Sequence, residues 1–195
     1  MEKKNSVTEK TGLFGIGGKM PIQMLVISAL MAALSIVLGK YLAINAGEFM
    51  RFSFENMPVI LTGIAFGPIV AVLVATVADL LGSLMVGYAI NPIITLGAAA
   101  VGLCSGAIYM ILKKVNIHLA FRIAITVFLS HLIGSVTIKT VGLQVMYGVP
   151  YHVLFLWRSL NYLIIGALEA TLLTLLLGNK ALRRALEKAK RARER

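Results

Sequence analysis

The chain alternates between long apolar runs and short polar or basic connections. Six apolar runs predict helices near residues 21–43, 56–67, 69–88, 92–112, 119–146 and 152–178. A helix needs about 20 apolar residues to cross a bilayer. The second run is too short, because Gly67 and Pro68 interrupt it, so we expect it to recruit residues from Arg51 to Asn56. The pattern predicts an all-α membrane protein with six transmembrane helices.

Composition supports a membrane location. Apolar residues make up 58% of the chain and charged residues only 14%, and the mean hydropathy is +0.88, whereas about a quarter of a soluble domain is charged. We divide the chain into a lead at 1–20, a six-helix transmembrane domain at 21–178 and a basic tail at 179–195. The lead lacks the compact apolar core and cleavage site of a signal peptide. The tail is expected to be a solvated helical extension.

The positive charge predicts an orientation rather than a nucleic-acid partner. Fifteen of the 19 Lys and Arg residues lie before the first predicted span, between the fourth and fifth, and after the sixth. An even number of spans brings these segments to one side of the membrane. The excess of Lys and Arg in cytoplasmic segments then predicts that both termini are cytoplasmic.

Four basic residues break this bias: Lys40, Arg51, Lys139 and Arg158. Arg51 belongs to the first external loop, and Arg158 lies about two turns into the last helix, at hydrocarbon depth. Lys139 is roughly 17 positions beyond Arg122 and reaches the outer side. Lys40, near a helix end, is expected to extend to the interface as an anchor.

Two explanations of these outer cations stay open. They can hold an anion in an outward-facing cavity, or they can pair internally with Glu48, Glu55 or Asp79. Asp79 falls near the middle of the third span, where a carboxylate must be paired, protonated or hydrated. It can accept hydrogen bonds from a heterocyclic ligand or form an ion pair with Arg158.

Further candidates for the site supply neutral hydrogen-bonding groups or flat rings. They are Asn91, Thr95, Phe52, Phe54, Tyr88 and Trp157. The aromatic residues can stack on a ligand ring, although aromatic residues also gather at any membrane interface. Glu169, towards the cytoplasmic end of the last span, is expected to contact a neighbouring helix or a partner subunit.

The sequence offers no chemistry for an enzyme or an ATPase. The stretch from Gly15 to Lys19 resembles a phosphate loop, but Met20 stands where Ser or Thr should hold magnesium, and no strand precedes it. The three histidines have no metal-ligand spacing, and no nucleophile is paired with a base. We therefore expect no catalytic residue, metal or cofactor, and energy for uphill transport must come from other polypeptides.

Several segments together resemble the substrate-binding S components of energy-coupling factor (ECF) transporters. In order they are ALMAA at 29–33, RFSFENMP at 51–58, LTGIAFGP at 61–68, VADLLG at 77–82 and MYGVP at 146–150, followed by Arg158. The last segment resembles the folate branch in particular. The resemblance covers the chain from about residue 22 to 178.

The resemblance implies a six-helix bundle in a prokaryotic plasma membrane, with an outward-facing site for a vitamin. It also implies that Ala29 and Ala33 dock an EcfT-like membrane coupling subunit, which two cytoplasmic EcfA-like ATPases drive. ATP would be bound only by those partners. The S component would topple in the membrane to release its vitamin inside.

Folate is the expected ligand. Its two tail carboxylates suit Arg51, Lys139 and Arg158, and its pterin donors suit Asp79 or Asn91. The segment NPIIT at 91–95 departs from the Gly- and Phe-rich approach expected in a folate protein. Riboflavin or a queuosine precursor are therefore alternatives, whereas cationic thiamine suits the basic residues poorly. A non-transporting membrane scaffold or enzyme instead predicts internally paired arginines and no outer cavity.

Overall fold

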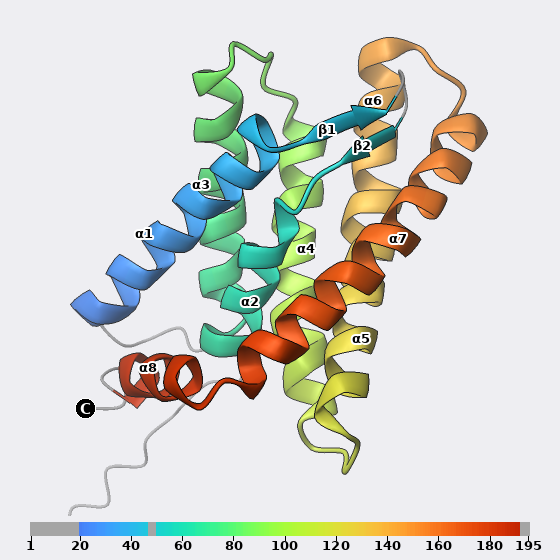
Figure 1. Ribbon diagram of the computed structural model, residues 1–195. Helices are drawn as coiled ribbons and strands as arrows, with labels where there is room; N and C mark the ends of the chain where they lie inside the picture. The colour runs from blue at the N-terminus through green and yellow to red at the C-terminus, as the bar shows by residue number, and fades with distance from the viewer. Residues whose placement is uncertain (1–19, 47–49, 192–195) are drawn as a thin grey trace, which may run out of the picture.

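The computed structural model describes residues 20–46 and 50–191 and is a bundle of helices (Figure 1). Almost all of the predicted lead, 1–20, lies outside the described residues, as does Glu48. The elements are α1 (Ile22–Ile36), the π-helical η1 (Val37–Tyr41), β1 (Ile44–Ala46), β2 (Met50–Phe52), α2 (Asn56–Phe66), α3 (Pro68–Met85), α4 (Pro92–Leu112), α5 (Leu119–Ser130), the π-helical η2 (His131–Ile138), α6 (Lys139–Tyr147), α7 (Tyr151–Gly178) and α8 (Lys180–Arg191).

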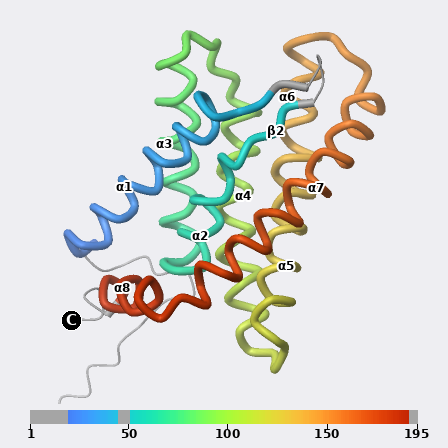
Figure 2. The backbone as a smooth tube through the Cα atoms, in the orientation of Figure 1, coloured from blue at the N-terminus to red at the C-terminus, as the bar shows by residue number. Residues whose placement is uncertain are grey.

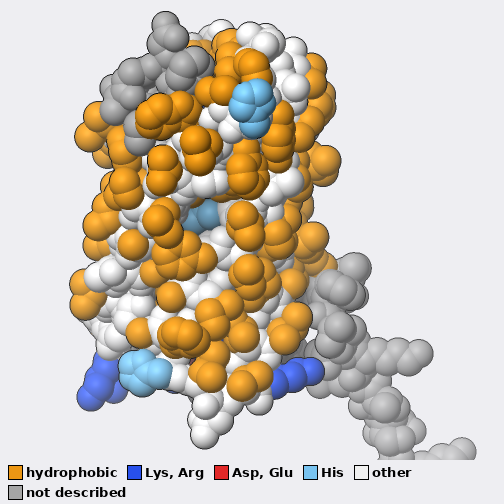
Figure 3. Space-filling model, turned by 90° about the vertical axis from the view of Figure 1, so that its right-hand side faces the viewer, with side chains coloured by type: hydrophobic (Ala, Val, Ile, Leu, Met, Phe, Trp, Pro, Cys, Tyr) orange, Lys and Arg blue, Asp and Glu red, His pale blue; other side chains and the backbone are white. Residues whose placement is uncertain are grey.

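Five helical stretches in the described residues are long and apolar enough to span a membrane. They are Ile22–Tyr41, Pro68–Met85, Pro92–Leu112, Leu119–Tyr147 and Tyr151–Gly178, and α2 is a shorter apolar helix. The predicted all-α membrane bundle is confirmed, and its spans agree with these helices within a few residues. Figure 3 shows one face of the bundle, on which hydrophobic side chains cover the middle and Lys and Arg appear near one end.

The prediction that residues from Arg51 onward extend the second helix is wrong. Met50–Phe52 forms β2, which pairs antiparallel with β1 so that Ile44 lies opposite Phe52. The strand pairing holds this backbone extended, and α2 begins only at Asn56. It is 11 residues long, or about half of what a bilayer crossing needs. At its other end, Gly67 adopts a φ of 94° and turns the chain into α3, which starts with Pro68.

Small residues let α2, α3 and α4 approach each other closely. A Cβ atom on Gly102 would lie 2.6 Å from the carbonyl oxygen of Ala71, and one on Gly106 would collide with the backbone of Pro68. A Cβ atom on Gly63 would collide with the side chain of Ser105. These contacts explain why small residues recur four positions apart in α2 and α4. They seal the bundle at the end that α8 occupies (Figure 1).

The start of α1 and the whole of α8 lie at the same end of the bundle, as Figure 2 shows. The tail is more than the expected solvated extension, because α8 packs against α1, α2 and α7. Leu186 and Ala189 of α8 are buried. Ala29 and Ala33 lie on an exposed face of α1.

Candidate functional site

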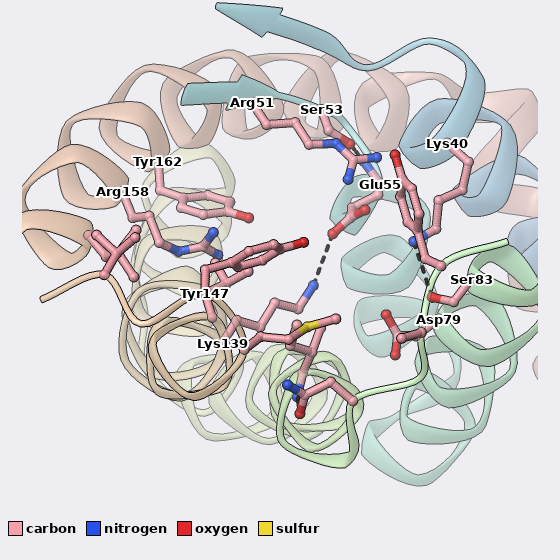
Figure 4. Close-up of a pocket in the computed structure, with 18 residues that line it drawn as sticks. Lys40, Arg51, Ser53, Glu55, Asp79, Ser83, Lys139, Tyr147, Arg158 and Tyr162 are labelled. Atoms are coloured by element: carbon pink, nitrogen blue, oxygen red, sulfur yellow. Dashed lines mark hydrogen bonds and ion pairs between the residues drawn. The ribbon is translucent and has the colours of Figure 1, made fainter. Parts of the chain in front are cut away.

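A cavity of about 720 Å³ lies at the end of the bundle opposite α8 (Figure 4). Its lining comes from η1, from β2 and the segment after it, and from α3, α4, α6 and α7. The lining residues are Lys40, Arg51, Ser53, Glu55, Asp79, Ser83, Tyr88, Ala89, Asn91, Ile94, Lys139, Leu143, Met146, Tyr147, Val149, Leu154, Arg158 and Tyr162. The cavity exists because α2 is short. The segment before α2, which includes Arg51, Ser53 and Glu55, forms part of the cavity wall and does not fill its centre.

The cavity carries more positive than negative side chains. Lys40, Arg51, Lys139 and Arg158 line it together with only two carboxylates, Glu55 and Asp79. With the usual protonation states the lining therefore has a formal charge of +2. A partly enclosed site strengthens such electrostatic attraction relative to bulk water, so the cavity favours an anionic ligand.

Lys139 and Glu55 form an ion pair across the cavity (Figure 4). Lys139 Nζ lies 2.9 Å from Glu55 Oε1, and the side chains are 7% and 24% exposed. Burial alone would raise the pKa of Glu55, but the positive charges of Lys139 and Arg51 outweigh it and lower the pKa to about 2. Glu55 is therefore an anion at neutral pH and is the internal counter-charge of the surrounding cations.

Backbone carbonyl groups of the two π-helical segments hold the two arginines. Arg158 donates from Nε and Nη2 to the Ser135 oxygen in η2, at 3.1 and 2.7 Å. Arg51 donates to the Gly39 oxygen in η1. The wide turns of a π-helix are frequent at functional sites, and here their carbonyls orient cations without neutralising them. Within the described residues neither guanidinium forms an ion pair with a carboxylate, although the charge of Arg51 helps to lower the pKa of Glu55.

Asp79 contacts a neighbouring helix and not an arginine. Its Oδ2 accepts a hydrogen bond from Thr95 Oγ1 at 2.7 Å. Within the described part of the chain, Arg158 has no ion pair with Asp79 or Glu55. Lys139 thus has an internal partner, but the arginines line an open cavity without an ion pair to any described residue. The hypothesis of a scaffold without a ligand predicts internally paired arginines and no outer cavity, which is not what the structure has.

The family model for the substrate-specific component of ECF transporters matches residues 23–182. The chain belongs to this family. A folate transporter FolT of Clostridium novyi (strain NT) is 29% identical over 150 residues, which cover 76% of this chain and 84% of that protein. A solved structure described as the crystal structure of FolT bound with folic acid superposes with a TM-score of 0.64 at 22% identity, covering 79% of this chain and 92% of that one. That similarity shows a shared fold.

Six of the ten residues predicted for the site of this S component line the cavity. They are Arg51, Asp79, Tyr88, Asn91, Lys139 and Arg158. Asn91 also caps α4, because its Oδ1 accepts from the backbone N–H of Ile93 at 2.9 Å. The remaining four lie outside the lining, each for a local geometric reason.

Phe52 and Phe54 alternate with the lining residues Arg51, Ser53 and Glu55. Met50–Phe52 is a strand, in which successive side chains point to opposite sides, so Phe52 lies on the side opposite to Arg51. Neither ring belongs to the lining, so their role as stacking residues stays a prediction.

Thr95 and Trp157 also lie outside the lining. Thr95 lies behind Asp79 and orients its carboxylate through the hydrogen bond described above. Trp157 is 41% exposed. It immediately precedes Arg158, and one residue corresponds to about 100° of helix rotation, so the indole lies away from the cavity. Trp157 therefore fits the interfacial alternative.

Lys40 is in the cavity, although its position near a helix end predicts an interfacial anchor. Its Nζ donates to Ser83 Oγ at 3.4 Å and lies 5.6 Å from the centre of the Tyr88 ring.

Tyr147 and Tyr162 also line the cavity and point towards its centre in Figure 4. Tyr147 belongs to the segment MYGVP, so the family resemblance could have identified it as a site residue. No local sequence pattern identifies Tyr162.

A buried polar cluster supports the wall that carries Arg158. His131 Nε2 lies 2.6 Å from Glu169 Oε2, and His131 Nδ1 lies 3.4 Å from Ser135 Oγ. The His131 ring packs on Tyr162 with 4.7 Å between ring centres. For Glu169 we expected contact with either a neighbouring helix or a partner subunit, and the structure shows the contact with a neighbouring helix. No group of three His, Cys, Asp or Glu side chains able to hold a metal occurs in residues 20–46 and 50–191.

Proposed function

We propose that this S component binds folate in its cavity and delivers it to an EcfT-like coupling subunit driven by two EcfA-like ATPases. The observation that carries the proposal is the excess of cations in the lining, four against two carboxylates. Folate has two carboxylates on its glutamate tail, and its charge thus complements the cavity. The folate transporter that is 29% identical to this chain, and the solved FolT with folic acid, support the same ligand.

The size of the cavity also supports folate. Sites for small molecules usually measure about 300–1,000 Å³, and this one has about 720 Å³. In the proposed complex, Arg51, Lys139 and Arg158 bind the carboxylates through charge-assisted hydrogen bonds. Asp79 accepts hydrogen bonds from the pterin, with Thr95 holding its other oxygen in place.

Aromatic side chains of the lining supply stacking surfaces. Tyr88, Tyr147 and Tyr162 come from the loop after α3, from α6 and from α7. In the proposal they take the stacking role that the sequence suggested for Phe52, Phe54 and Trp157. Aromatic rings of this kind offer large apolar contact areas to a flat ligand.

The coupling subunit is proposed to dock on α1 through Ala29 and Ala33. Both alanines lie on an exposed face of this helix, and small residues permit close approach of another transmembrane helix. The positive-inside bias supports cytoplasmic termini in a prokaryotic plasma membrane, with the cavity opening outside. The chain itself would bind no ATP.

Purification from folate-supplied cells tests the ligand. Mass spectrometry and absorbance should detect folate in the wild-type protein, and Arg158→Ala should lose at least about nine-tenths of it, because one charge-assisted contact is worth about 1.5–3 kcal/mol. The matched control is Trp157→Ala, one residue away and outside the cavity lining, which should retain folate. Recovery of a flavin instead would refute folate as the ligand. Equal loss in both variants would refute the cavity as its site.

Uptake by cells that contain the whole transporter tests the docking face. Ala29→Trp combined with Ala33→Trp should abolish folate uptake, while the purified variant still binds folate. Phe121→Trp combined with Leu129→Trp, on an exposed face of α5, is the control and should leave uptake intact. Normal uptake by the α1 variant would exclude this face as the docking site.

A further inference from the structure

The helix α8 joins the core of the bundle by one side only. Leu186 and Ala189 are 7% and 1% exposed, and they belong to the same buried cluster as Met24 of α1 and Leu177 of α7. Leu182 packs against that cluster. These positions recur at helical spacing and form one apolar face. The helix is therefore a docked element with a fixed orientation.

The side of α8 away from the core is strongly basic. Its exposed cationic residues are Lys180, Arg183, Arg184, Lys188 and Lys190. One carboxylate of α8, Glu187, lies among them and forms an ion pair with Arg183 at 2.9 Å. Arg184 and Lys188 are four positions apart, so they lie on the same side of the helix. This side therefore carries a dense positive charge.

α8 begins at Lys180, directly after the helix Tyr151–Gly178, which is long and apolar enough to span a membrane, so α8 lies where a span ends. In Figure 1, α8 runs across the direction of α3 and α4, beneath α1 and α2, and the connection between α4 and α5 extends farther from the cavity than α8 does. The helix thus lies beneath α1 and α2 but does not extend as far as the α4–α5 connection. Because the apolar side of α8 is packed on the bundle, only its basic side is available to headgroups, and the attraction is electrostatic.

We propose that α8 binds the headgroups of anionic phospholipids through Lys180, Arg184 and Lys188, which are four positions apart on its outward side. Negative lipids attract basic segments near the membrane surface, and no other element within residues 20–46 and 50–191 presents five exposed cations on one short helix. Because α8 packs on α1, bound lipid also steadies the helix that carries Ala29 and Ala33. This inference goes beyond the proposed function and does not depend on which vitamin the cavity holds.

Thermal unfolding of the full chain in lipid nanodiscs tests the proposal. Wild-type protein should have a higher Tm in phosphatidylcholine mixed with phosphatidylglycerol than in phosphatidylcholine alone. Arg184→Gln with Lys188→Gln should lose about half or more of that increase, because the attraction scales with the number of basic residues near the surface. Lys113→Gln with Lys114→Gln removes the same charge from the exposed connection after α4 and should retain most of the increase.

Three results would overturn the proposal. The first is no increase of Tm with phosphatidylglycerol, and the second is an equal loss in the two double variants, which indicates diffuse attraction. The third comes from a nitroxide label at Ala185→Cys in a Cys104→Ser background. Ala185 is exposed on α8, and the label should report headgroup depth by its accessibility to oxygen and to a water-soluble nickel complex. Accessibility typical of bulk water would place α8 away from the lipid.

Discussion

The same two helices, α3 and α4, behave differently at their two ends. Towards α8 they touch backbone to backbone, because Gly102 faces Ala71 and Gly106 faces Pro68. Towards the cavity they carry Asp79, Ser83, Asn91 and Ile94 on their inner sides. The distance between two helices depends on the side chains at their contact. Small residues close one half of this bundle, and larger polar residues keep the other half open for a ligand.

The two halves should therefore respond differently to mutation. In the closed half a larger side chain collides with backbone that cannot move, so we expect the substitution to lower the stability of the folded protein. In the cavity half, a few contacts orient the charged side chains, so we expect a substitution to lower the affinity for the ligand. Four experiments test this division, from the largest expected effect to the smallest.

Gly106→Leu should prevent accumulation of folded protein. Even a Cβ atom at this position collides with the backbone of Pro68, and overpacking of this kind costs about 1–3 kcal/mol or more. Size-exclusion chromatography in detergent should show aggregated or absent material. Gly178→Leu is the control, since a Cβ atom there meets nothing within 4 Å. A monodisperse Gly106→Leu protein with a normal Tm would contradict the close contact.

Lys139→Met should weaken folate binding by about 100-fold while the protein stays folded, because it removes a cation from the cavity and leaves Glu55 without its partner. Titration calorimetry measures the change in Kd. Adding Glu55→Gln to this variant should restore part of the affinity, since the unpaired carboxylate then no longer repels the ligand. A double variant that binds as poorly as the single one would show that the ion pair is irrelevant to binding.

His131→Leu should weaken binding by about tenfold, because Tyr162 loses its ring contact and Ser135 loses a hydrogen-bond partner. Leu173→Ala, a buried change on the same helix as Glu169, should lower the Tm without changing Kd. If both variants change Kd equally, the buried cluster serves stability alone and does not position the cavity wall.

Acid should affect the cavity half through Glu55. Its pKa falls from 4.5 to about 2 on folding, so the ionised group stabilises the folded state fully above the unfolded value. That contribution declines as the pH falls from about 4.5 towards 2. The difference in Tm between wild type and Glu55→Gln should therefore be constant near neutral pH and shrink over this window. A constant difference down to pH 2 would show that Glu55 is not paired.

Helices and their order could be predicted because apolar runs and their breakers are local features. Gly67 with Pro68, and Gly148 with Pro150, lie at helix ends both in the pattern and in the structure. The start of α2 could not be predicted, because the pairing of β2 with β1 is a contact between separate segments. Arg51, Lys139 and Arg158 could be found because they are basic residues on the outer side, against the bias of the other cations.

The direction of side chains was harder to predict than their depth. Depth follows from counting residues, but direction depends on the exact rotation of each helix or strand. Phe52 and Trp157 each adjoin a cationic lining residue, Arg51 or Arg158, and yet lie outside the lining. Only Met50–Phe52 of this segment is a strand, so no simple alternation identifies Ser53 and Glu55, and the inward direction of Lys40 depends on the π-helical η1.

The wide turns of η2 also act as an angular offset within one continuous helix, Leu119–Tyr147. Extra residues per turn shift the phase of everything that follows, and one residue corresponds to about 100°. Deleting a single residue within His131–Ile138 would let one wide turn tighten into an α turn, while Lys139 and the rest of α6 keep their direction. The change would fall on the segment that contains Ser135, whose carbonyl orients Arg158. The support of the cavity wall would change without the substitution of any lining residue.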